Sequence, residues 1–224
     1  MRGYGQYCPV ALGAEIFAER WTPIILRNLM LGCDRFGQIL DGAPGLPRSV
    51  LSQRLRHLEA EGIVARVPTA SGGSYRLTPA GEDLGEVCLA LGAWGARWRD
   101  ARRADLDPYL ALWMLAQLIE PASLPRDRVV VRVDLTDGSR PNHYWLIADQ
   151  ADAEVCVEFP GFSEDGVMTT DAAWLVRWHT ARVTLPAALK AGRIRVDGPR
   201  WVARLLTAWG RLSPFAEIAA ARAS

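Results

Sequence analysis

The segment at residues 48–61 constrains the fold of this chain most strongly, because both its ends and its two faces are well defined. A turn rich in glycine and proline precedes it at residues 41–47, and a glycine follows it. Leu51, Leu55 and Leu58 recur at the spacing that places side chains on one side of an α-helix. The pattern therefore predicts an amphipathic helix that buries this leucine stripe.

The side of this helix opposite the leucines is polar. At about 100° per residue it carries Ser49, Gln53 and Arg56, with Ser52 beside them. Arginine and glutamine can bond the edges of guanine and adenine in a major groove, and serine suits bases or phosphates. Arg48 and Ser52 are better placed for phosphates. A helix with a merely solvated polar face would show the same periodicity, so the pattern alone leaves both interpretations open.

The elements around this helix follow a specific order. Apolar periodicity predicts three short helices up to residue 40, with Asp34 as the N-cap of the third. Alternation predicts two strands after the amphipathic helix, and Thr78 then caps a helix that begins at Pro79. The predicted elements are helices at residues 8–17, 21–31, 35–40 and 48–61, strands at 63–67 and 75–78, and a helix at 79–98.

A helix, a turn, a second helix and a hairpin are the parts of a winged helix-turn-helix. The second helix of such a motif enters the major groove of duplex DNA. The loop of the hairpin here is small and polar, which suits a wing that lies along the minor groove or the backbone. The wing candidates are Ser71, Gly72, Gly73, Ser74 and Arg76.

Several fixed spacings in the first half strengthen this interpretation. They include Cys8-Pro9, Arg20-Trp21-Thr22, Leu51-Ser52-Gln53-Arg54-Leu55 and Tyr75-Arg76-Leu77-Thr78-Pro79-Ala80-Gly81. With these motifs, residues 5–100 resemble the HxlR family of bacterial winged-helix regulators. The resemblance implies a homodimer that binds double-stranded DNA at a palindromic operator, with the first and last helices of this half at the dimer interface. Many members of that family are repressors and a few are activators.

Three residues of this half need separate treatment. Arg54 flanks the leucine stripe, so it suits a structural ion pair as well as a phosphate contact, and His57 is expected at the partly exposed rim. Cys8 matches the N-terminal cysteine through which some relatives in the HxlR family sense oxidants or electrophiles. Such sensing needs an accessible, stabilised thiolate, and the nearby Glu15 and Glu19 supply no positive charge. A structural role for Cys8 is therefore expected, with redox sensing as the alternative.

The second half has its own core-forming pattern. A charged stretch at residues 99–105 is predicted to link two domains, residues 1–100 and residues 107–224. The order of elements predicts an α+β domain with a mostly antiparallel sheet and helices gathered on one side, so the whole chain is α+β. The predicted elements are a helix at residues 108–119, strands at 129–135, 144–148, 155–159 and 167–169, helices at 171–178 and 185–190, a strand at 194–196 and a helix at 199–212.

The run from Leu185 to Pro199 resembles the end of the sterol-carrier-protein type of lipid-binding domain, and the resemblance covers residues 107–212. It implies an apolar tunnel between sheet and helices that holds a small apolar ligand. Core packing explains large apolar residues equally well, and the domain also suits dimerisation or partner binding. The candidate lining residues are Trp145, Ile147, Phe162, Met168, Trp174 and Trp178.

Composition and motifs argue against several other classes. No stretch approaches the roughly 18–20 apolar residues of a membrane span, and the N-terminus is too polar for a secretory signal. A cytoplasmic protein without a membrane partner is therefore expected. The four cysteines form no CxxC pair, which indicates neither a metal site nor a disulfide framework. No cofactor motif is present, and His57, His143 and His179 belong to no catalytic motif, so an enzyme is not expected.

The charge balance permits nucleic-acid binding without requiring it. The net charge is +1; residues 1–104 carry 13 arginines against 10 acidic residues, whereas residues 105–224 carry 13 basic against 15 acidic residues. The combined prediction is a regulator of transcription that binds operator DNA as a dimer and responds to a small apolar ligand. The alternative is a lipid-carrier or protein-interaction module in which the winged helix only dimerises.

Overall fold

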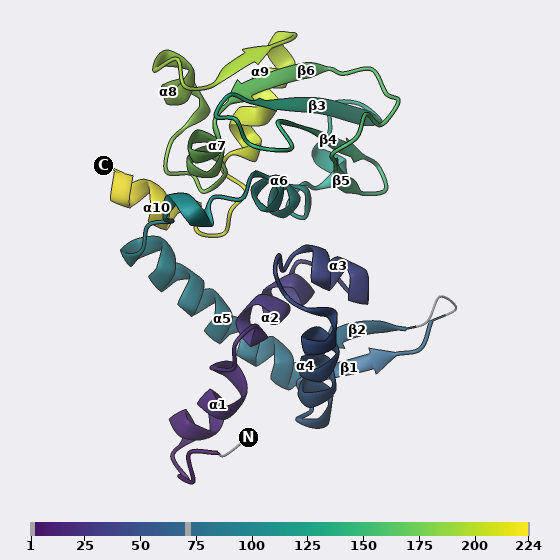
Figure 1. The fold of residues 1–224 in the computed structure, drawn as a ribbon, viewed down its shortest axis with the longest axis vertical. Helices are drawn as coiled ribbons and strands as arrows, with labels where there is room; N and C mark the ends of the chain where they lie inside the picture. Colours follow the sequence, from purple (N-terminus) through teal and green to yellow (C-terminus); the bar gives the residue numbers. More distant parts are fainter. Residues whose placement is uncertain (1–2, 70–72, 224) are drawn as a thin grey trace. The chain divides into compact units, whose positions relative to one another are not determined.

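The computed structural model describes residues 3–69 and 73–223. The chain divides into two units, Met1–Gly92 and Ala93–Ser224 (Figure 1). The division falls inside one continuous helix, α5 (Pro79–Trp98), so the end of this helix belongs to the second unit. Each unit builds a core from its own elements.

The first unit has the element order that the sequence predicts, and each element lies within about two residues of its expected range. Its helices before α5 are α1 (Pro9–Phe17), α2 (Thr22–Met30), α3 (Phe36–Asp41) and α4 (Arg48–Ala60), and its strands are β1 (Val64–Val67) and β2 (Ser74–Leu77). The two strands pair in an antiparallel hairpin. The winged helix-turn-helix order is therefore confirmed.

Helix α3 starts one residue later than expected. The N-cap position is taken by Arg35, whose backbone N–H donates to Gln38 Oε1 at 3.0 Å. Asp34 lies outside the helix, and its carbonyl accepts a hydrogen bond from the Tyr75 N–H of β2 at 2.7 Å. The prediction of Asp34 as N-cap is wrong, because a tertiary bond to the hairpin engages the backbone of Asp34.

Helix α4 buries the leucine stripe and ends as its sequence predicts. Leu51, Leu55 and Leu58 are each at most 1% exposed. Gly62 adopts a φ of +70°, and the Ile63 N–H donates to the Leu58 carbonyl at 2.9 Å, which satisfies a carbonyl at the helix end. This reversal turns the chain directly into β1.

The hairpin leads into α5 through a tight junction. The Gly81 N–H donates to Thr78 Oγ1 at 3.2 Å, and the Thr78 hydroxyl donates to the Ile63 carbonyl at 3.1 Å. The predicted cap at Thr78 is thus confirmed. A Cβ on Gly81 would lie 2.1 Å from the Ile63 carbonyl oxygen, so the start of α5 can approach β1 only because residue 81 is a glycine.

The second unit is a sheet with helices on one face. The strand order is β5-β4-β3-β6-β7, and among the described strands β3 and β6 form its only parallel pair. The predicted α+β fold with a mostly antiparallel sheet is confirmed. The elements after α5 are α6 (Pro108–Ala116), β3 (Arg128–Leu135), β4 (His143–Asp149), β5 (Ala153–Cys156), β6 (Gly166–Thr170), α7 (Ala172–His179), α8 (Leu185–Lys190), β7 (Arg195–Asp197), α9 (Arg200–Trp209) and α10 (Ala216–Ala223).

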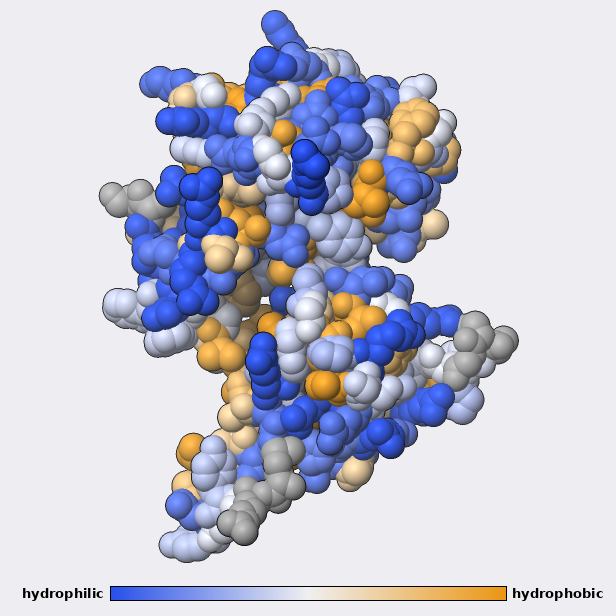
Figure 2. All heavy atoms as spheres, in the orientation of Figure 1, coloured by the Kyte–Doolittle hydropathy of each residue, from blue (hydrophilic) through white to orange (hydrophobic). Residues whose placement is uncertain are grey.

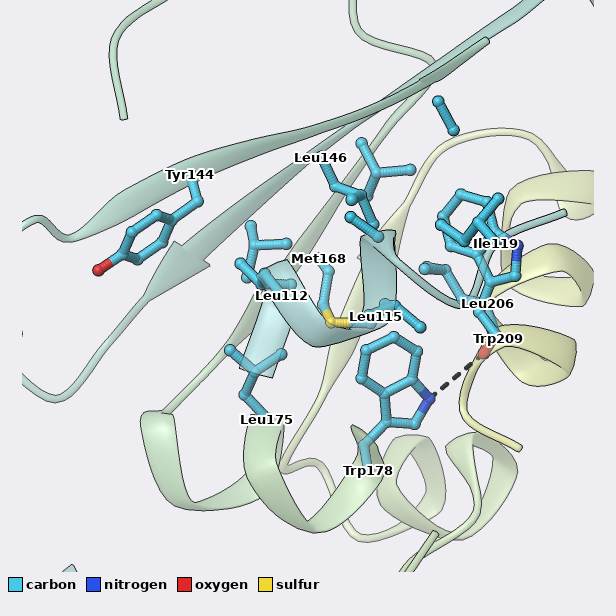
Figure 3. Packing of buried hydrophobic residues seen from close by; sticks show 14 of the residues in the cluster. Leu112, Leu115, Ile119, Tyr144, Leu146, Met168, Leu175, Trp178, Leu206 and Trp209 are labelled. Atoms are coloured by element: carbon cyan, nitrogen blue, oxygen red, sulfur yellow. Dashed lines mark hydrogen bonds between the residues drawn. The ribbon is translucent and has the colours of Figure 1, made fainter. Parts of the chain in front are cut away.

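The two faces of this sheet have different environments. Alternate residues of β3, such as Val131 and Val133, face the main core together with α6, α7 and α9 (Figure 3). Val130, Trp145 and Ile147 form a small separate cluster, and the antiparallel register pairs Val130 with Ile147. Strand alternation therefore places this cluster on the face turned away from the helices.

The end of the chain is anchored within the second unit. Arg222 of α10 donates to the Arg99 carbonyl at 2.9 Å and to Asp100 Oδ2 at 2.6 Å. Arg182 also pairs with Asp100 and donates to the Arg99 carbonyl at 2.7 Å. Residues 99 and 100, which the sequence predicts as linker, are thus fixed by side chains from two later segments.

Two further differences from the sequence prediction concern element ends. Helix α10 is not among the predicted elements, and β5 ends at Cys156 instead of residue 159. Val157 and Phe159 leave the sheet and are 44% and 64% exposed. Among the described residues, no helix combines the length and the apolar character needed to cross a lipid bilayer.

Candidate nucleic-acid interface

Helix α4 presents a polar surface opposite its buried leucines. Ser49, Ser52, Gln53 and Arg56 are all exposed. The Arg56 guanidinium donates to the Ser52 carbonyl at 3.3 Å, one turn earlier, so the arginine lies along the helix surface. The structure thus gathers the four predicted base- and phosphate-contacting residues on one accessible face.

Arg48 opens α4 and is also exposed. Its guanidinium lies 5.0 Å from the centroid of the Phe36 ring of α3, a distance typical of a cation–π contact. A positive charge in the first turn of a helix opposes the helix dipole. The stacking holds the Arg48 guanidinium against Phe36 of α3, at the N-terminal end of α4, and the first amide groups of a helix are a common binding site for phosphate.

The wing is only partly described. Arg76 is exposed on β2, and Gly73 is half-buried. Ser74 is 9% exposed and pairs with Val67 in the hairpin, so its side chain is less accessible than the prediction assumes. Ser71 and Gly72 lie outside the described residues.

The helix-turn-helix is held together by a buried polar cluster that the sequence pattern does not predict. The Asn28 side-chain amide donates to the Ile39 carbonyl at 2.8 Å, and its oxygen accepts from Arg27 Nη2 at 2.8 Å. Arg27 Nη2 also donates to the Gly42 carbonyl. Burial lowers the pKa of the Arg27 guanidinium from its usual value. These contacts tie α2 to α3 and to the turn before α4; their only sequence signal is a polar pair within an otherwise apolar helix.

Of the two roles expected for Arg54, a structural ion pair and a phosphate contact, the structure shows the ion pair. Its Nη2 lies 2.6 Å from Glu19 Oε2, and both side chains are largely buried. This contact takes Arg54 away from the exposed face of α4. His57 is half-buried, with its Nδ1 3.9 Å from Glu61 Oε1, which agrees with the expected position at the rim.

A second surface of this chain is apolar. Val87, Leu91, Trp94 and Trp98 follow one another along α5 at alternating spacings of four and three residues, and each is about half exposed or more. The same spacing describes a helix face that packs against another helix. The N-terminal segment also exposes apolar side chains, of which Tyr7 and Val10 are 97% and 78% exposed. Orange apolar surface is visible beside α5 and α1 in Figure 2.

The four cysteines are free thiols. Cys8 is half-buried at the N-cap of α1, and its carbonyl accepts the first helical hydrogen bond from Leu12. Burial raises the pKa of the Cys88 and Cys156 thiols, which disfavours their thiolate forms. Redox sensing by Cys8 stays a prediction.

The six candidate ligand-lining residues do not share one face of the second unit. Met168 and Trp178 point into the core between the sheet and the helices (Figure 3), and Trp174 packs against that core. Trp145 and Ile147 lie in the cluster on the opposite sheet face. Phe162 is 38% exposed beneath the Arg128 guanidinium. A tunnel between sheet and helices could therefore be lined by at most half of the six.

Two buried polar atoms near the helices of this unit have no hydrogen-bond partner among the described residues. They are His179 Nδ1 at the end of α7 and Trp209 Nε1 at the end of α9. Burial lowers the pKa of His179 to about 4, so this side chain is neutral at physiological pH. An unpaired buried polar atom costs about 1–3 kcal/mol, and a polar group brought in from outside would recover part of that cost. In the described part of the chain, no group of three or more His, Cys, Asp or Glu residues is arranged to hold a metal ion.

Comparisons with known proteins concern mainly the first half of the chain. The family model described as HxlR-like helix-turn-helix matches residues 16–103. An uncharacterized HTH-type transcriptional regulator of Mycobacterium tuberculosis is 44% identical over 89 residues, which are 38% of this chain and 56% of that protein. YvaP of Bacillus subtilis, also named an uncharacterized HTH-type transcriptional regulator, is 34% identical over 45% of this chain and 96% of its own length. The chain thus spans little more than half of its mycobacterial relatives.

This chain is also similar to several proteins of solved structure. The redox regulator HypR in its oxidized form is 28% identical, with a TM-score of 0.39 over 42% of this chain and 100% of that chain. The ubiquinone synthesis protein UbiJ-SCP2 is 16% identical, with a TM-score of 0.32 over 60% of this chain and 98% of that chain. The family assignment depends instead on YvaP, which is aligned over nearly its whole length, and on the matched family model. This chain belongs to the HxlR-like helix-turn-helix family.

Proposed function

We propose that this protein is a transcriptional regulator that binds duplex DNA as a homodimer and represses its target genes until a small apolar ligand reaches the second unit. DNA binding is assigned to α4 and to the β1–β2 wing. The operator is a palindrome, because two identical α4 helices related by a two-fold axis would meet inverted half-sites.

The observation that carries this proposal is the division of α4 into two faces. Leu51, Leu55 and Leu58 anchor the helix in the core, whereas Gln53 and Arg56 stand exposed on the other side. A side chain must be exposed and bear correctly placed donors to read base edges. The arginine that does not meet this condition, Arg54, is engaged in an ion pair with Glu19.

Dimerisation is supported by the apolar stripe on α5. Val87, Leu91, Trp94 and Trp98 are exposed although they are large and apolar. Soluble monomers rarely leave such a contiguous stripe in contact with water. A second copy of α5 and of the N-terminal segment would bury it.

Ligand sensing is supported by the second unit. His179 Nδ1 and Trp209 Nε1 are buried without partners among the described residues, which gives this largely apolar region two points for hydrogen bonding. Coupling between two sites is typically about 1–3 kcal/mol, or roughly 5- to 150-fold in affinity. Organic extraction of the purified protein, followed by mass spectrometry, tests this part: recovery of no small apolar molecule, together with no uptake of added fatty acid, would count against it.

The test of DNA binding is the double variant Gln53→Ala/Arg56→Ala in the full chain. With the promoter region upstream of its own gene as probe, we expect the affinity to fall by ~100-fold, because each bidentate base contact is worth about 1–3 kcal/mol. Affinity for a random-sequence duplex should change much less. The control Gln150→Ala/Arg103→Ala removes the same two residue types from exposed positions in the second unit.

Unchanged promoter selectivity in the α4 variant, with the dimer intact, would show that the recognition helix is misassigned. Failure of the unmodified protein to prefer its promoter over random DNA would favour the alternative of a carrier or interaction module whose winged helix only dimerises.

A further inference from the structure

The charges of the second unit are strongly segregated along the chain. Residues 105–171 contain thirteen acidic and four basic residues. Residues 172–216 contain eight basic residues and one acidic residue, Asp197. The small net charge of the protein therefore hides a basic segment that covers α7, α8, β7 and α9.

The fold places much of this segment around β7, at the two ends of this edge strand and on the helices next to it. Strand β7 is the last strand on its side, and α8 packs against both α7 and α9. Lys190 ends α8 and Arg193 lies two residues before β7. Arg200 is the first residue of α9, and Arg204 follows one turn later. We call these four residues the edge cluster; all are exposed. Deep blue, strongly hydrophilic side chains project over this part of the unit in Figure 2.

In the described part of the chain, the edge cluster has no acidic counterpart. Within the described residues, none of its four side chains forms an ion pair, whereas the neighbouring Arg195 pairs with Asp197 at 2.9 Å. Arg193 instead lies 5.9 Å from the centroid of the Trp174 ring, and Arg177 lies 5.4 Å from the same ring. An aromatic ring positions a guanidinium without neutralising its charge.

The two arginines on α9 destabilise the helix that carries them. Arg200 is the first residue of α9, where a positive charge is unfavourable to the helix dipole. Arg204 follows one turn later on the same exposed side, so two like charges face each other at a spacing that costs a few tenths of a kcal/mol. Arg48 has the same first-residue position on α4. Intramolecular stability thus does not explain these charges, whereas an external anion would.

We propose that the edge cluster binds the phosphate backbone of duplex DNA, as a second and sequence-independent contact of the full-length protein. The cluster offers guanidinium and ammonium groups, which suit phosphate oxygens. It would add affinity on DNA of any sequence. The inference goes beyond the assignment of α4, and because random-sequence DNA reports on it, it can fail while the proposed function stands.

The test uses the variant Arg193→Gln/Arg200→Gln/Arg204→Gln in the full chain. Its affinity for a random-sequence duplex is measured against salt concentration, because each phosphate contact contributes about 0.9 to the slope of log K against log salt. We expect the slope to fall by roughly 2–3 for each protomer whose edge cluster contacts the duplex. The matched control Arg102→Gln/Arg103→Gln/Arg140→Gln removes three exposed arginines of the same unit from outside the cluster, and its slope should stay near that of the unmodified protein.

A second measurement uses the Gln53→Ala/Arg56→Ala background, in which promoter selectivity is lost. Addition of the three cluster changes should still lower the salt slope there. An unchanged slope in both backgrounds overturns the proposal, with circular dichroism used to verify that the variants fold.

Two specific results would also overturn it. If the triple variant loses binding to phosphatidylglycerol vesicles but keeps its binding to the duplex, the cluster binds a lipid surface instead. Aggregation of the variant with an unchanged slope would mean that the charges only protect the edge strand β7 from pairing with other chains.

Discussion

At the scale of single residues, Asn28 is a buried polar group that links α2 to α3. Its side chain is fully buried, and it joins Arg27 of the same helix to the Ile39 carbonyl of α3. A buried polar group that loses its partner costs more than the bond itself contributes, because it is left without water.

Asn28→Ala should therefore lower the free energy of unfolding by about 2 kcal/mol, since it leaves the Ile39 carbonyl and Arg27 without their shared partner. Urea denaturation followed by circular dichroism measures the change. Gln150→Ala, at an exposed position, should stay within about 0.5 kcal/mol of the unmodified protein. Equal stability of the two variants would contradict the role of Asn28.

His179 makes the stability of the second unit depend on pH. Its pKa is lowered to about 4 by burial, while an unfolded chain has a histidine pKa near about 6.5. Above that value the residue is neutral in both states and has no effect. As the pH falls from about 6.5 to about 4, only the unfolded state takes up the proton, so stability falls by up to about 3 kcal/mol.

Unfolding free energies measured between pH 7.5 and pH 4.5 should therefore decrease less steeply in His179→Gln than in the unmodified protein. The difference in slope isolates this histidine from the carboxylates, which titrate in both proteins. Parallel curves for the two proteins would rule out a buried, neutral His179.

At the scale of elements, α5 contains glycines in contrasting surroundings. A Cβ on Gly81 would meet the Ile63 carbonyl oxygen at 2.1 Å, whereas a Cβ on Gly95 would have no neighbour within 4 Å. The same chemical change should therefore have opposite effects at the two positions of one helix.

Gly81→Ala should destabilise the protein by about 2 kcal/mol, because the start of α5 must move away from β1. Gly95→Ala should stabilise it by up to about 1 kcal/mol through the higher helix propensity of alanine. Thermal denaturation of both variants distinguishes these effects, and a shift of the same sign in both would refute the close approach at Gly81.

The elements also show what the sequence could and could not predict. The leucine spacing of α4 and the glycine that ends it are local signals, and they predict this helix to within one residue. The N-cap of α3 could not be predicted, because Tyr75, about forty residues later, engages the Asp34 carbonyl. Strand β4 is buried on both faces, so its alternation could not show that Trp145 and Ile147 face away from the helices. The exposed face of α4 was predictable; the Arg27–Asn28 cluster was not, since its bonds depend on the fold.

At the scale of the whole molecule, the proposed function requires two copies of the chain. The α5 stripe supplies apolar area for that contact, and Leu91 lies near its middle. Val87 and Leu91 belong to the first unit, whereas Trp94 and Trp98 belong to the second.

Leu91→Arg should convert the dimer to a monomer, because it places a charge within the apolar contact. Sedimentation velocity measures the change, and affinity for the promoter should fall in parallel. Glu86→Arg introduces the same positive charge at an exposed position of α5, about 140° around the helix from Leu91, and should leave the dimer intact. A monomeric unmodified protein, or a dimeric Leu91→Arg variant, would contradict the proposed interface.

The continuity of α5 across the boundary at Gly92 determines how the protein can be dissected. Truncation at this boundary would leave one fragment without Trp94 and Trp98, and the other with an uncapped helix start at Ala93. A fragment meant to represent the DNA-binding half should therefore extend through Trp98. A shorter fragment would pair weakly even if its helix-turn-helix folds correctly, and its poor binding would then be attributed to the wrong half of the protein.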